Sequence, residues 1–193
     1  MKFFYVLLMG YIIGSISFAV LVGRIYGVNI LKAGSGNPGA TNIKRVLGKG
    51  PGNVVFALDF GKGIAATVLP SLWMPGVEML PICGLLGCLL GHNYSLFLKF
   101  RGGKGVAVTV GGLLVLMPFV FGLGAAIWIS SFYAFRYVSL ASILLGLSLP
   151  ISSYCFNEST LNRVVALLLC LSILIKHRSN IVRLFKGTEH RFK

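Results

Sequence analysis

Long apolar runs separated by short polar stretches constrain this chain more than any other feature. About 20 apolar residues in a helix cross a bilayer core of about 30 Å, and helices satisfy their own backbone polar groups in lipid. Only 11% of the residues are charged, against about 25% in soluble domains. We therefore expect an all-α, polytopic transmembrane helix bundle that forms a single domain over residues 1–193. The runs lie at about 3–23, 54–73, 79–98, 106–117, 119–135, 138–156 and 161–175.

The number of spans depends on the two short runs that meet at Pro118. The first three runs are long enough to cross the membrane, whereas 106–117 and 119–135 are short. They form one long kinked helix, two short helices in a hairpin, or re-entrant segments that do not cross. These alternatives give six, seven and five spans respectively.

The position of the positive charges favours an odd number of spans, because Lys and Arg concentrate on the cytoplasmic side. With seven spans, 15 of the 18 basic residues fall on one face. With six, the basic tail 176–193 falls on the opposite face from the stretches 24–52 and 99–104. We expect seven spans, some of them short, with the N-terminus outside and the C-terminus inside. Five spans would keep the same orientation.

Several features of the runs predict structure and no chemistry. The first run has one basic residue before it and a weak cleavage site, so we expect a retained helix and no signal peptide. Gly87 and Gly91 are four residues apart, which favours close helix packing. The four cysteines lie in apolar runs without a CxxC pair and are expected to be small buried hydrophobes. We find no His, Cys and carboxylate cluster with metal-ligand spacing and expect no metal and no cofactor.

The net charge of +14 points to an anionic partner. In a soluble protein such a charge would suggest nucleic acid. Here the cations lie in short loops between apolar runs, so we expect no nucleic acid. Anionic lipid or a small anionic substrate is the better interpretation.

The stretch 24–52 contains a Gly-rich loop, Gly34–Asn42 (GSGNPGATN), followed by Arg45. Successive glycines let backbone N–H groups converge on an anion, and Ser and Asn add short donors. The spacing also matches a nucleotide-binding P-loop, but Ala40 stands in place of the essential Lys and no carboxylate pair remains for Mg²⁺. We exclude that site, and an anion site and a plain surface turn both remain open.

A second loop, Lys99–Gly105, holds three cations and three glycines in seven residues. It precedes a helix expected from Val106, whose free N–H groups and dipole would favour an anion. A loop that only sets membrane orientation needs the cations but not the glycines. Phosphate binding is therefore the favoured interpretation.

The basic tail contains His177 and Asn180, which share a helix face if the last helix continues past Ile175. Such a pair can recognise a hydroxyl and a phosphate. Glu189 is the only acid in this tail, and a structural salt bridge is its expected role.

Asp59 and Lys62 lie three apart within the second run, where they can pair on one helix face. Intramembrane ionisable residues are functional candidates, and a tether between helices is an equal alternative. His92 has Phe97 where soluble glycerolipid acyltransferases of the HxxxxD type carry Asp, so that mechanism is excluded. With a single Asp in the chain, no Ser/His/Asp triad is credible.

Four motifs in series resemble the bacterial acyl-phosphate:glycerol-3-phosphate acyltransferase family. The resemblance covers essentially the whole chain, in order and with matching length. The motifs are GSGNPGATN with Arg45, LDFGKG (Leu58–Gly63), GHNYSLFLKFRGGKGVA (Gly91–Ala107) and KHRSNIVRLFKGTE (Lys176–Glu189).

The resemblance implies a multi-pass enzyme of the cell inner membrane with seven spans and an active site at the cytoplasmic face. It implies transfer of an acyl chain from acyl phosphate, and not from acyl-CoA or acyl-carrier protein, to the 1-hydroxyl of glycerol 3-phosphate. The products would be 1-acyl-glycerol 3-phosphate (lysophosphatidate) and inorganic phosphate, in the first step of phospholipid biosynthesis. Membrane lipid is the remaining expected partner, a monomer is compatible with the sequence, and acyl-chain preference stays open.

Each motif residue then receives an expected role. Ser35, Arg45, His177 and Asn180 are the expected catalytic residues, and Asp59 and Glu189 are expected to be structural. Ser139 and Ser142 start the sixth run near Arg136, and they are expected to reach the cytoplasmic pocket. The expected substrate-binding residues are Gly34, Gly36, Asn37, Thr41, Asn42, Lys62, Gly102, Gly103, Lys104, Gly105 and Ser142.

The chemistry of the expected donor suggests that no strong protein base is needed. Phosphate is a good leaving group, so positioning and charge stabilisation supply much of the rate. Our hypothesis is that a substrate phosphate oxygen takes the hydroxyl proton, with His177 as the rival base. A transporter for organic phosphate is the alternative function, but it predicts internal repeats and midplane sites, which the sequence does not show.

Overall fold

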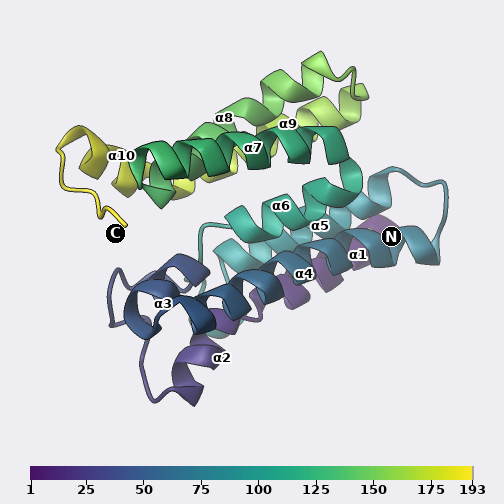
Figure 1. Cartoon of the computed structure of the whole chain (residues 1–193). Helices are drawn as coiled ribbons and strands as arrows, with labels where there is room; N and C mark the ends of the chain where they lie inside the picture. Colours follow the sequence, from purple (N-terminus) through teal and green to yellow (C-terminus); the bar gives the residue numbers. More distant parts are fainter. Residues whose placement is uncertain (193) are drawn as a thin grey trace. The chain divides into compact units, whose positions relative to one another are not determined.

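The computed structural model describes residues 1–192, so Lys193 of the basic tail lies outside the described residues. In this part the chain forms ten α-helices, one short 3₁₀ helix and a single isolated β-bridge (Figure 1). The chain divides into two compact units, one of residues 1–115 and one that begins at Leu116. The all-α expectation is confirmed, and each unit is described by itself.

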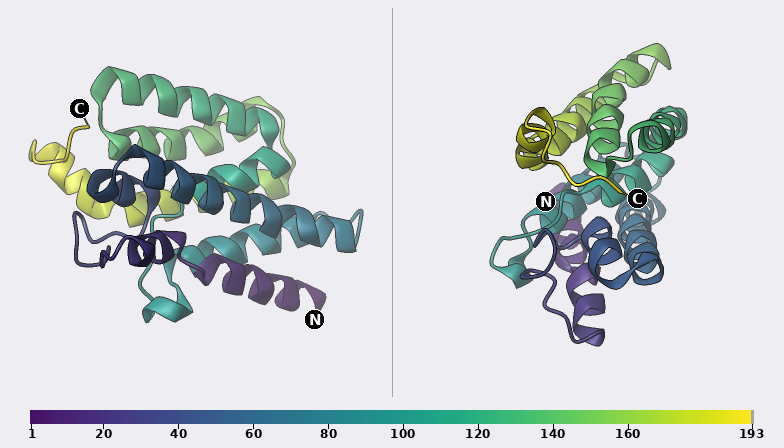
Figure 2. Two further views of the ribbon diagram at one scale, coloured as in Figure 1. Left: turned by 60° about the horizontal axis from the view of Figure 1, so that its bottom comes forward. Right: turned by 60° about the vertical axis from the view of Figure 1, so that its left-hand side comes forward.

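The first unit packs α1, α4 and α5 side by side (Figure 2). Gly14 on α1 and Gly87 and Gly91 on α5 permit this packing. A Cβ atom on Gly87 would overlap the carbonyl oxygen of Leu7, and one on Gly91 would overlap that of Tyr11. The close approach expected from the glycine spacing is therefore confirmed. The unit contains α1 (Lys2–Ser15), α2 (Phe18–Ile25), α3 (Ala40–Leu47), α4 (Lys49–Trp73), α5 (Met79–Asn93), η1 (Leu96–Leu98) and α6 (Val106–Leu116).

The first apolar run is not the single helix that we expected. It breaks after Ser15, where Ile16 has an extended backbone, and α2 starts again at Phe18. The Ser17 hydroxyl caps α2 by accepting a hydrogen bond from the backbone N–H of Val20. A polar N-cap inside an apolar run is easily overlooked, because the hydropathy of the run hardly changes there.

Two further boundaries differ from those expected. The stretch 24–52 is not all loop, since it holds α3 and the start of α4 at Lys49, one helical turn before the apolar run. The third run, 79–98, leaves the helix at Asn93. A tight turn follows, in which the Ser95 N–H donates to the carbonyl of Arg101 and the Phe100 N–H donates to that of Ser95.

The second unit contains α7 (Pro118–Phe135), α8 (Val138–Cys155), α9 (Thr160–Lys176) and α10 (Arg178–Phe185). α7 packs on α8, and α8 packs on α9 (Figure 1). The turn from α7 to α8 is short because Arg136 takes a positive φ of 63°. Residues 106–135 thus form two helices, separated at Met117 by a non-helical φ of −143°, and a single continuous helix is excluded.

Within residues 1–192, four stretches are long and apolar enough to cross a membrane: Lys2–Ile25, α4, α7 and α8. A fifth is the pair α9 and α10, which is bent by 60°. The remaining apolar helices, α5 and α6, have 15 and 11 residues. These helices support a membrane-spanning bundle, while the count of seven and the orientation of the termini stay predictions.

Candidate active-site residues in the two units

The Gly-rich loop of the first unit rests on a small apolar cluster. Ile30 and Ile43, both buried, contact Ala19 and Val55 beneath the loop. Gly39 precedes α3, and its carbonyl accepts hydrogen bonds from the N–H groups of Asn42 and Ile43. The earlier N–H groups of such a helix have no partner within the helix, so this N-terminus suits an anion.

Asn42 organises the loop from within. Its side chain is buried, and its Nδ2 donates to the carbonyls of Ala33 at 3.0 Å and Ile30 at 3.3 Å. Its Oδ1 accepts from the Ser35 N–H at 2.8 Å. Gly34 passes so close that a Cβ atom would overlap this oxygen, and its φ of 58° favours glycine. These contacts give Asn42 a structural role in the loop, and its expected contact with substrate stays a prediction.

The same carboxamide links the two expected catalytic residues of this loop. Arg45 lies one turn after Asn42 on α3, and its Nη1 donates to the Asn42 Oδ1 at 3.4 Å. Ser35 is exposed, and its Oγ accepts from the Asn37 N–H at 3.5 Å. Thr41 is half-buried in the first turn of α3. The structure therefore brings Ser35 and Arg45 together around one buried amide.

The second expected phosphate loop, Gly102–Gly105, leads directly into α6, which begins at Val106 as predicted. Gly105 has a φ of 79°, and its carbonyl accepts from the Thr109 N–H at 2.8 Å. The Gly103 N–H donates to the carbonyl of His92 at 3.0 Å. Lys104 is half-buried next to this anchored backbone.

Lys62 and Asp59 form the expected pair on α4, with Nζ and Oδ1 2.9 Å apart. The ammonium also donates to the carbonyls of Ile16 at 2.8 Å and Gly14 at 3.1 Å, at the break between α1 and α2. These three acceptors match the three N–H donors of a lysine, and the side chain is 4% exposed. These contacts are those of a tether between helices, and the expected substrate contact of Lys62 stays a prediction.

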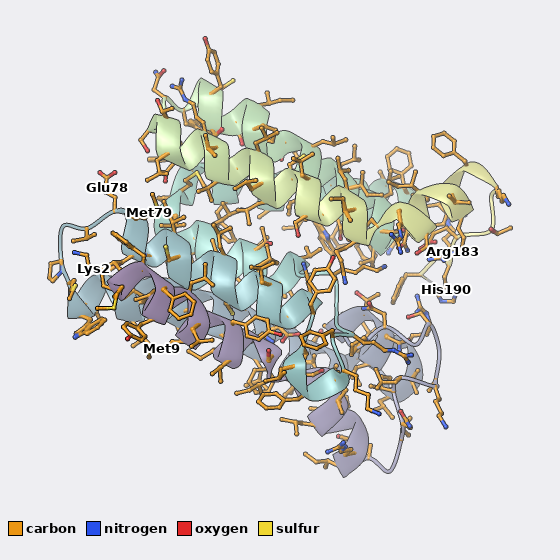
Figure 3. All side chains as sticks on the ribbon, turned by 180° about the vertical axis from the view of Figure 1, so that it is seen from behind. Lys2, Met9, Glu78, Met79, Arg183 and His190 are labelled. Atoms are coloured by element: carbon orange, nitrogen blue, oxygen red, sulfur yellow. The ribbon has the colours of Figure 1, made fainter. Side chains whose placement is uncertain are left out.

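The loops of the first unit lie at one end of it. Figure 3 shows Lys2, at the start of α1, and Glu78, at the turn before α5, at the opposite end of this unit from α2, α3 and η1. Ser95 joins η1 to α1, because its Oγ donates to the Ser15 carbonyl at 2.6 Å. The phosphate-binding candidates Arg45 and Lys104 are thus gathered at the same end.

In the second unit, Glu189 joins three side chains. Its Oε1 accepts from Asn180 Nδ2 at 2.7 Å and from Ser139 Oγ at 2.9 Å, and its Oε2 accepts from Arg183 Nε at 2.7 Å. Burial alone would raise the pKa of Glu189, but the hydrogen bonds from Asn180, Arg183 and Ser139 and the charge of Arg183 lower it below its ordinary value. The carboxylate therefore holds α8, α10 and the tail together.

His177 lies at the bend between α9 and α10. The sequence left open whether the last helix continues past Ile175; α9 ends at Lys176, and α10 starts at Arg178 after the bend. The N–H of Asn180 donates to the His177 carbonyl at 2.8 Å, so His177 precedes the first turn of α10. Its Nδ1 lies 2.8 Å from the Ile173 carbonyl, so Nδ1 carries the proton. In the neutral ring the lone pair is then on Nε2.

Ser142 is buried between α7 and α8. Its Oγ donates to the Val138 carbonyl at 2.8 Å and accepts from Trp128 Nε1 at 3.2 Å. Trp128 was not singled out from the sequence, because an aromatic residue in an apolar run carries no signal of its own.

Two cysteines, Cys88 and Cys170, are buried as expected, but Cys155 is exposed.

The comparisons with known proteins agree with these motifs. The family model for glycerol-3-phosphate acyltransferases matches residues 4–187. The chain belongs to the glycerol-3-phosphate acyltransferase family. A glycerol-3-phosphate acyltransferase 2 of Bacillus anthracis is 41% identical over 186 residues, which are 96% of each chain. A glycerol-3-phosphate acyltransferase of Desulforamulus reducens is 40% identical over 182 residues, which are 94% of this chain and 90% of the relative.

A solved structure extends the likeness to the fold. The crystal structure of PlsY (YgiH), an integral membrane glycerol 3-phosphate acyltransferase, in its glycerol 3-phosphate form, has a TM-score of 0.93 and 36% identity. The match covers all of this chain and 96% of the other. This acyltransferase is thus an all-helical integral membrane protein. The motifs that carried the sequence resemblance lie in the Gly-rich loop and α3, within α4, between the end of α5 and the start of α6, and from the bend between α9 and α10 onward.

Proposed function

We propose that this acyltransferase moves an acyl group from acyl phosphate to the 1-hydroxyl of glycerol 3-phosphate. The observation that carries the proposal is family membership over residues 4–187, combined with two Gly-rich loops that each lead into a helix N-terminus. Lys104 lies two residues before α6, and Arg45 in the last turn of α3 donates back to Asn42 in the first turn of that helix. Both substrates carry phosphate, so two such sites are the expected complement. Lysophosphatidate and inorganic phosphate are the products.

The reaction is an acyl transfer from a mixed anhydride. The hydroxyl oxygen of the acceptor attacks the acyl carbonyl carbon, and the bond from that carbon to the phosphate oxygen breaks. The electron pair of that bond leaves with phosphate, and the hydroxyl proton goes to a base. Because phosphate is already a good leaving group, the protein's main contributions are alignment of the two substrates and stabilisation of negative charge.

The residue roles follow from the charges and donors in each motif. Arg45 and Lys104 hold phosphate groups, and Ser35 adds a hydroxyl beside Arg45. The first N–H groups of α3 and α6 assist them, since helix N-termini favour anions. His177 and Asn180 orient the acceptor, and Glu189 fixes the amide of Asn180 through the 2.7 Å hydrogen bond.

The proton acceptor is a phosphate oxygen of one of the substrates. The chain has only four carboxylates. Asp59 is paired with Lys62, and both oxygens of Glu189 accept hydrogen bonds. Glu158 accepts a hydrogen bond from Asn162, and Glu78 lies at the end of the first unit opposite to the loops that carry Arg45 and Lys104 (Figure 3). His177 is the rival base, through its Nε2.

Most of the 15 basic residues that we assign to one face orient the protein in the membrane, and only a few of them bind phosphate. We place the enzyme in the inner membrane, with its loops at the cytoplasmic face, by the positive-inside rule. Acyl phosphate reaches it from the bilayer, and glycerol 3-phosphate from the cytoplasm. A monomer suffices for this chemistry, and no metal or other cofactor takes part.

The decisive assay combines purified protein with palmitoyl phosphate and glycerol 3-phosphate and measures both inorganic phosphate and lysophosphatidate. We expect equal amounts of the two products, none without the acceptor, and none when palmitoyl-CoA replaces palmitoyl phosphate. Arg45→Ala and Lys104→Ala should each abolish most turnover. No phosphate release, together with uptake of glycerol 3-phosphate into protein-containing vesicles, would reject the enzyme in favour of a transporter.

A further inference from the structure

One buried titratable group has no part in the reaction above. His92 lies at the end of α5 with 8% of its surface exposed. On one side its Nδ1 is 3.6 Å from Asp59 Oδ1, and the Nζ of Lys62 forms an ion pair with the same oxygen. The ring therefore belongs to the charged group that ties α4 to the break between α1 and α2.

On its other side the same ring meets the loop that carries Lys104. The three atoms nearest to a Cβ built on Gly103 are Nε2, Cε1 and Cδ2 of His92, and the Cβ would overlap Nε2. The Gly103 N–H donates to the His92 carbonyl at 3.0 Å. Gly103 is thus held against His92 by its backbone and bounded by the imidazole ring.

The neighbouring glycine has a different boundary. A Cβ on Gly102 would overlap the backbone of His92 and Asn93 rather than a side chain. The glycines of this loop therefore have a packing role, which a loop that only sets membrane orientation would not need. Lys104 follows directly, so a shift of Gly103 moves the backbone that presents its ammonium group.

From these contacts we propose that His92 is a positioning residue for the phosphate-binding loop Gly102–Gly105. Its Nδ1 side is fixed by the Asp59–Lys62 pair, and its Nε2 side sets where Gly103 and Lys104 lie. This inference rests on the proposed function, in which Lys104 holds a phosphate group, and it takes that group to be the phosphate of glycerol 3-phosphate. It assigns no chemical step to His92 itself.

Two substitutions test the proposal: one removes the ring of His92, and the other adds a methyl group at Gly103. In His92→Asn the amide keeps a donor near the Nδ1 position, but the ring atoms beside Gly103 are lost. In Gly103→Ala the new methyl group meets the ring. Each single variant should raise the KM for glycerol 3-phosphate about tenfold or more, since shifts of about 1 Å can cost as much as 10²-fold. The KM for palmitoyl phosphate and the kcat should change much less.

The double variant separates positioning from general damage. In His92→Asn with Gly103→Ala the methyl group occupies space that the ring has left, so the KM should return to within about threefold of the wild type. The matched control is Gly102→Ala with His92→Asn, which should show no relief because Gly102 faces backbone atoms. Gly61→Ala, whose Cβ meets no heavy atom of residues 1–192 within 4 Å, should leave both KM values unchanged.

Unchanged KM values in both single variants, or a double variant as impaired as the Gly102 control, would overturn the positioning role. If either single variant gives little folded protein, the yield of folded double variant becomes the readout, and failure to restore it would also overturn the proposal. An inactive wild type would instead reject the proposed function. The two failures are therefore distinguishable.

Discussion

At the scale of single residues, Asn42 gives the clearest prediction, because the nitrogen and the oxygen of its carboxamide bind different partners. Its Nδ2 donates to two carbonyls, and its Oδ1 accepts from Ser35 and Arg45. Asn42→Asp keeps the acceptor but sets a carboxylate oxygen against the carbonyls of Ala33 and Ile30. We expect a loss of about 1–3 kcal/mol in the free energy of unfolding.

The loss should appear as a lower Tm and a lower kcat/KM, since the loop carries Ser35 and Arg45. Asn29→Asp is the matched control, because the exposed Asn29 side chain is an acceptor only, for the Leu31 N–H. If both variants melt like the wild type, Asn42 does not organise the loop.

His177 gives the prediction that separates the two proton acceptors. A general base contributes typically about 10²- to 10⁴-fold to a rate. If a substrate phosphate takes the proton, His177→Gln should lose less than about 10²-fold in kcat and should keep the pH dependence of the wild type. His177→Asn checks the bend, since an amide N–H can replace Nδ1 beside Ile173. Abolished turnover with intact glycerol 3-phosphate binding would make His177 the base.

At the scale of elements, the sequence predicted the helices better than it predicted where they break. The apolar runs, the start of α6 at Val106 and the packing at Gly87 follow from hydropathy and spacing, which act over many residues. The break after Ser15 depends on the Ser17 cap and on hydrogen bonds that Lys62 and Ser95 donate to carbonyls of residues 14–16. The bend at His177 depends on the contact of its ring with the Ile173 carbonyl. The role of Asn42 was missed for the same reason, because its partners are backbone carbonyls that a motif does not reveal.

The cluster around Glu189 predicts a dependence of stability on pH. Since the folded pKa of Glu189 is lowered, the carboxylate stabilises the fold fully above its ordinary pKa of about 4.3 and loses this effect as the pH falls through the lowered value. We therefore expect Glu189→Gln to lower the Tm at neutral pH and to approach the wild type in acid. Glu158→Gln is the control. A constant difference in Tm from about pH 3 to about pH 7 would contradict the prediction.

The packing of α1 on α5 predicts a cost for one added methyl group. Gly87→Ala places a Cβ against the Leu7 carbonyl, so the helices must separate. Overpacking of this kind costs about 1–3 kcal/mol, which thermal unfolding in detergent measures. Gly61→Ala makes the same chemical change at an open position and should not destabilise. Equal Tm values for the two variants would show that α1 and α5 move apart freely.

At the scale of the whole molecule, the positions of the charges and the lengths of the helices favour different numbers of membrane spans. The distribution of 18 basic residues favours an odd number of spans, whereas length and composition identify four spans, or five with the bent pair. The disagreement concerns α5 and α6, which are short for a bilayer of about 30 Å. Short helices can cross if the bilayer thins locally, so accessibility, and not hydropathy, must decide.

Single cysteines in a variant without the four native ones would measure that accessibility. With seven spans and the N-terminus outside, a membrane-impermeant thiol reagent added to intact spheroplasts should label Glu78→Cys and Asn157→Cys, and it should leave Lys99→Cys and Lys186→Cys unlabelled. Lys186→Cys decides the orientation, because six spans would expose it. Phe119→Cys decides between seven spans and the five-span alternative in which neither α6 nor α7 crosses, since the exposed residue at the start of α7 is then reached only from inside. If instead α5 and α6 were the two helices that do not cross, Lys99→Cys would be labelled. Protection of Phe119→Cys, with labelling after permeabilisation, would establish five spans and leave α6 and α7 on the cytoplasmic side of the membrane.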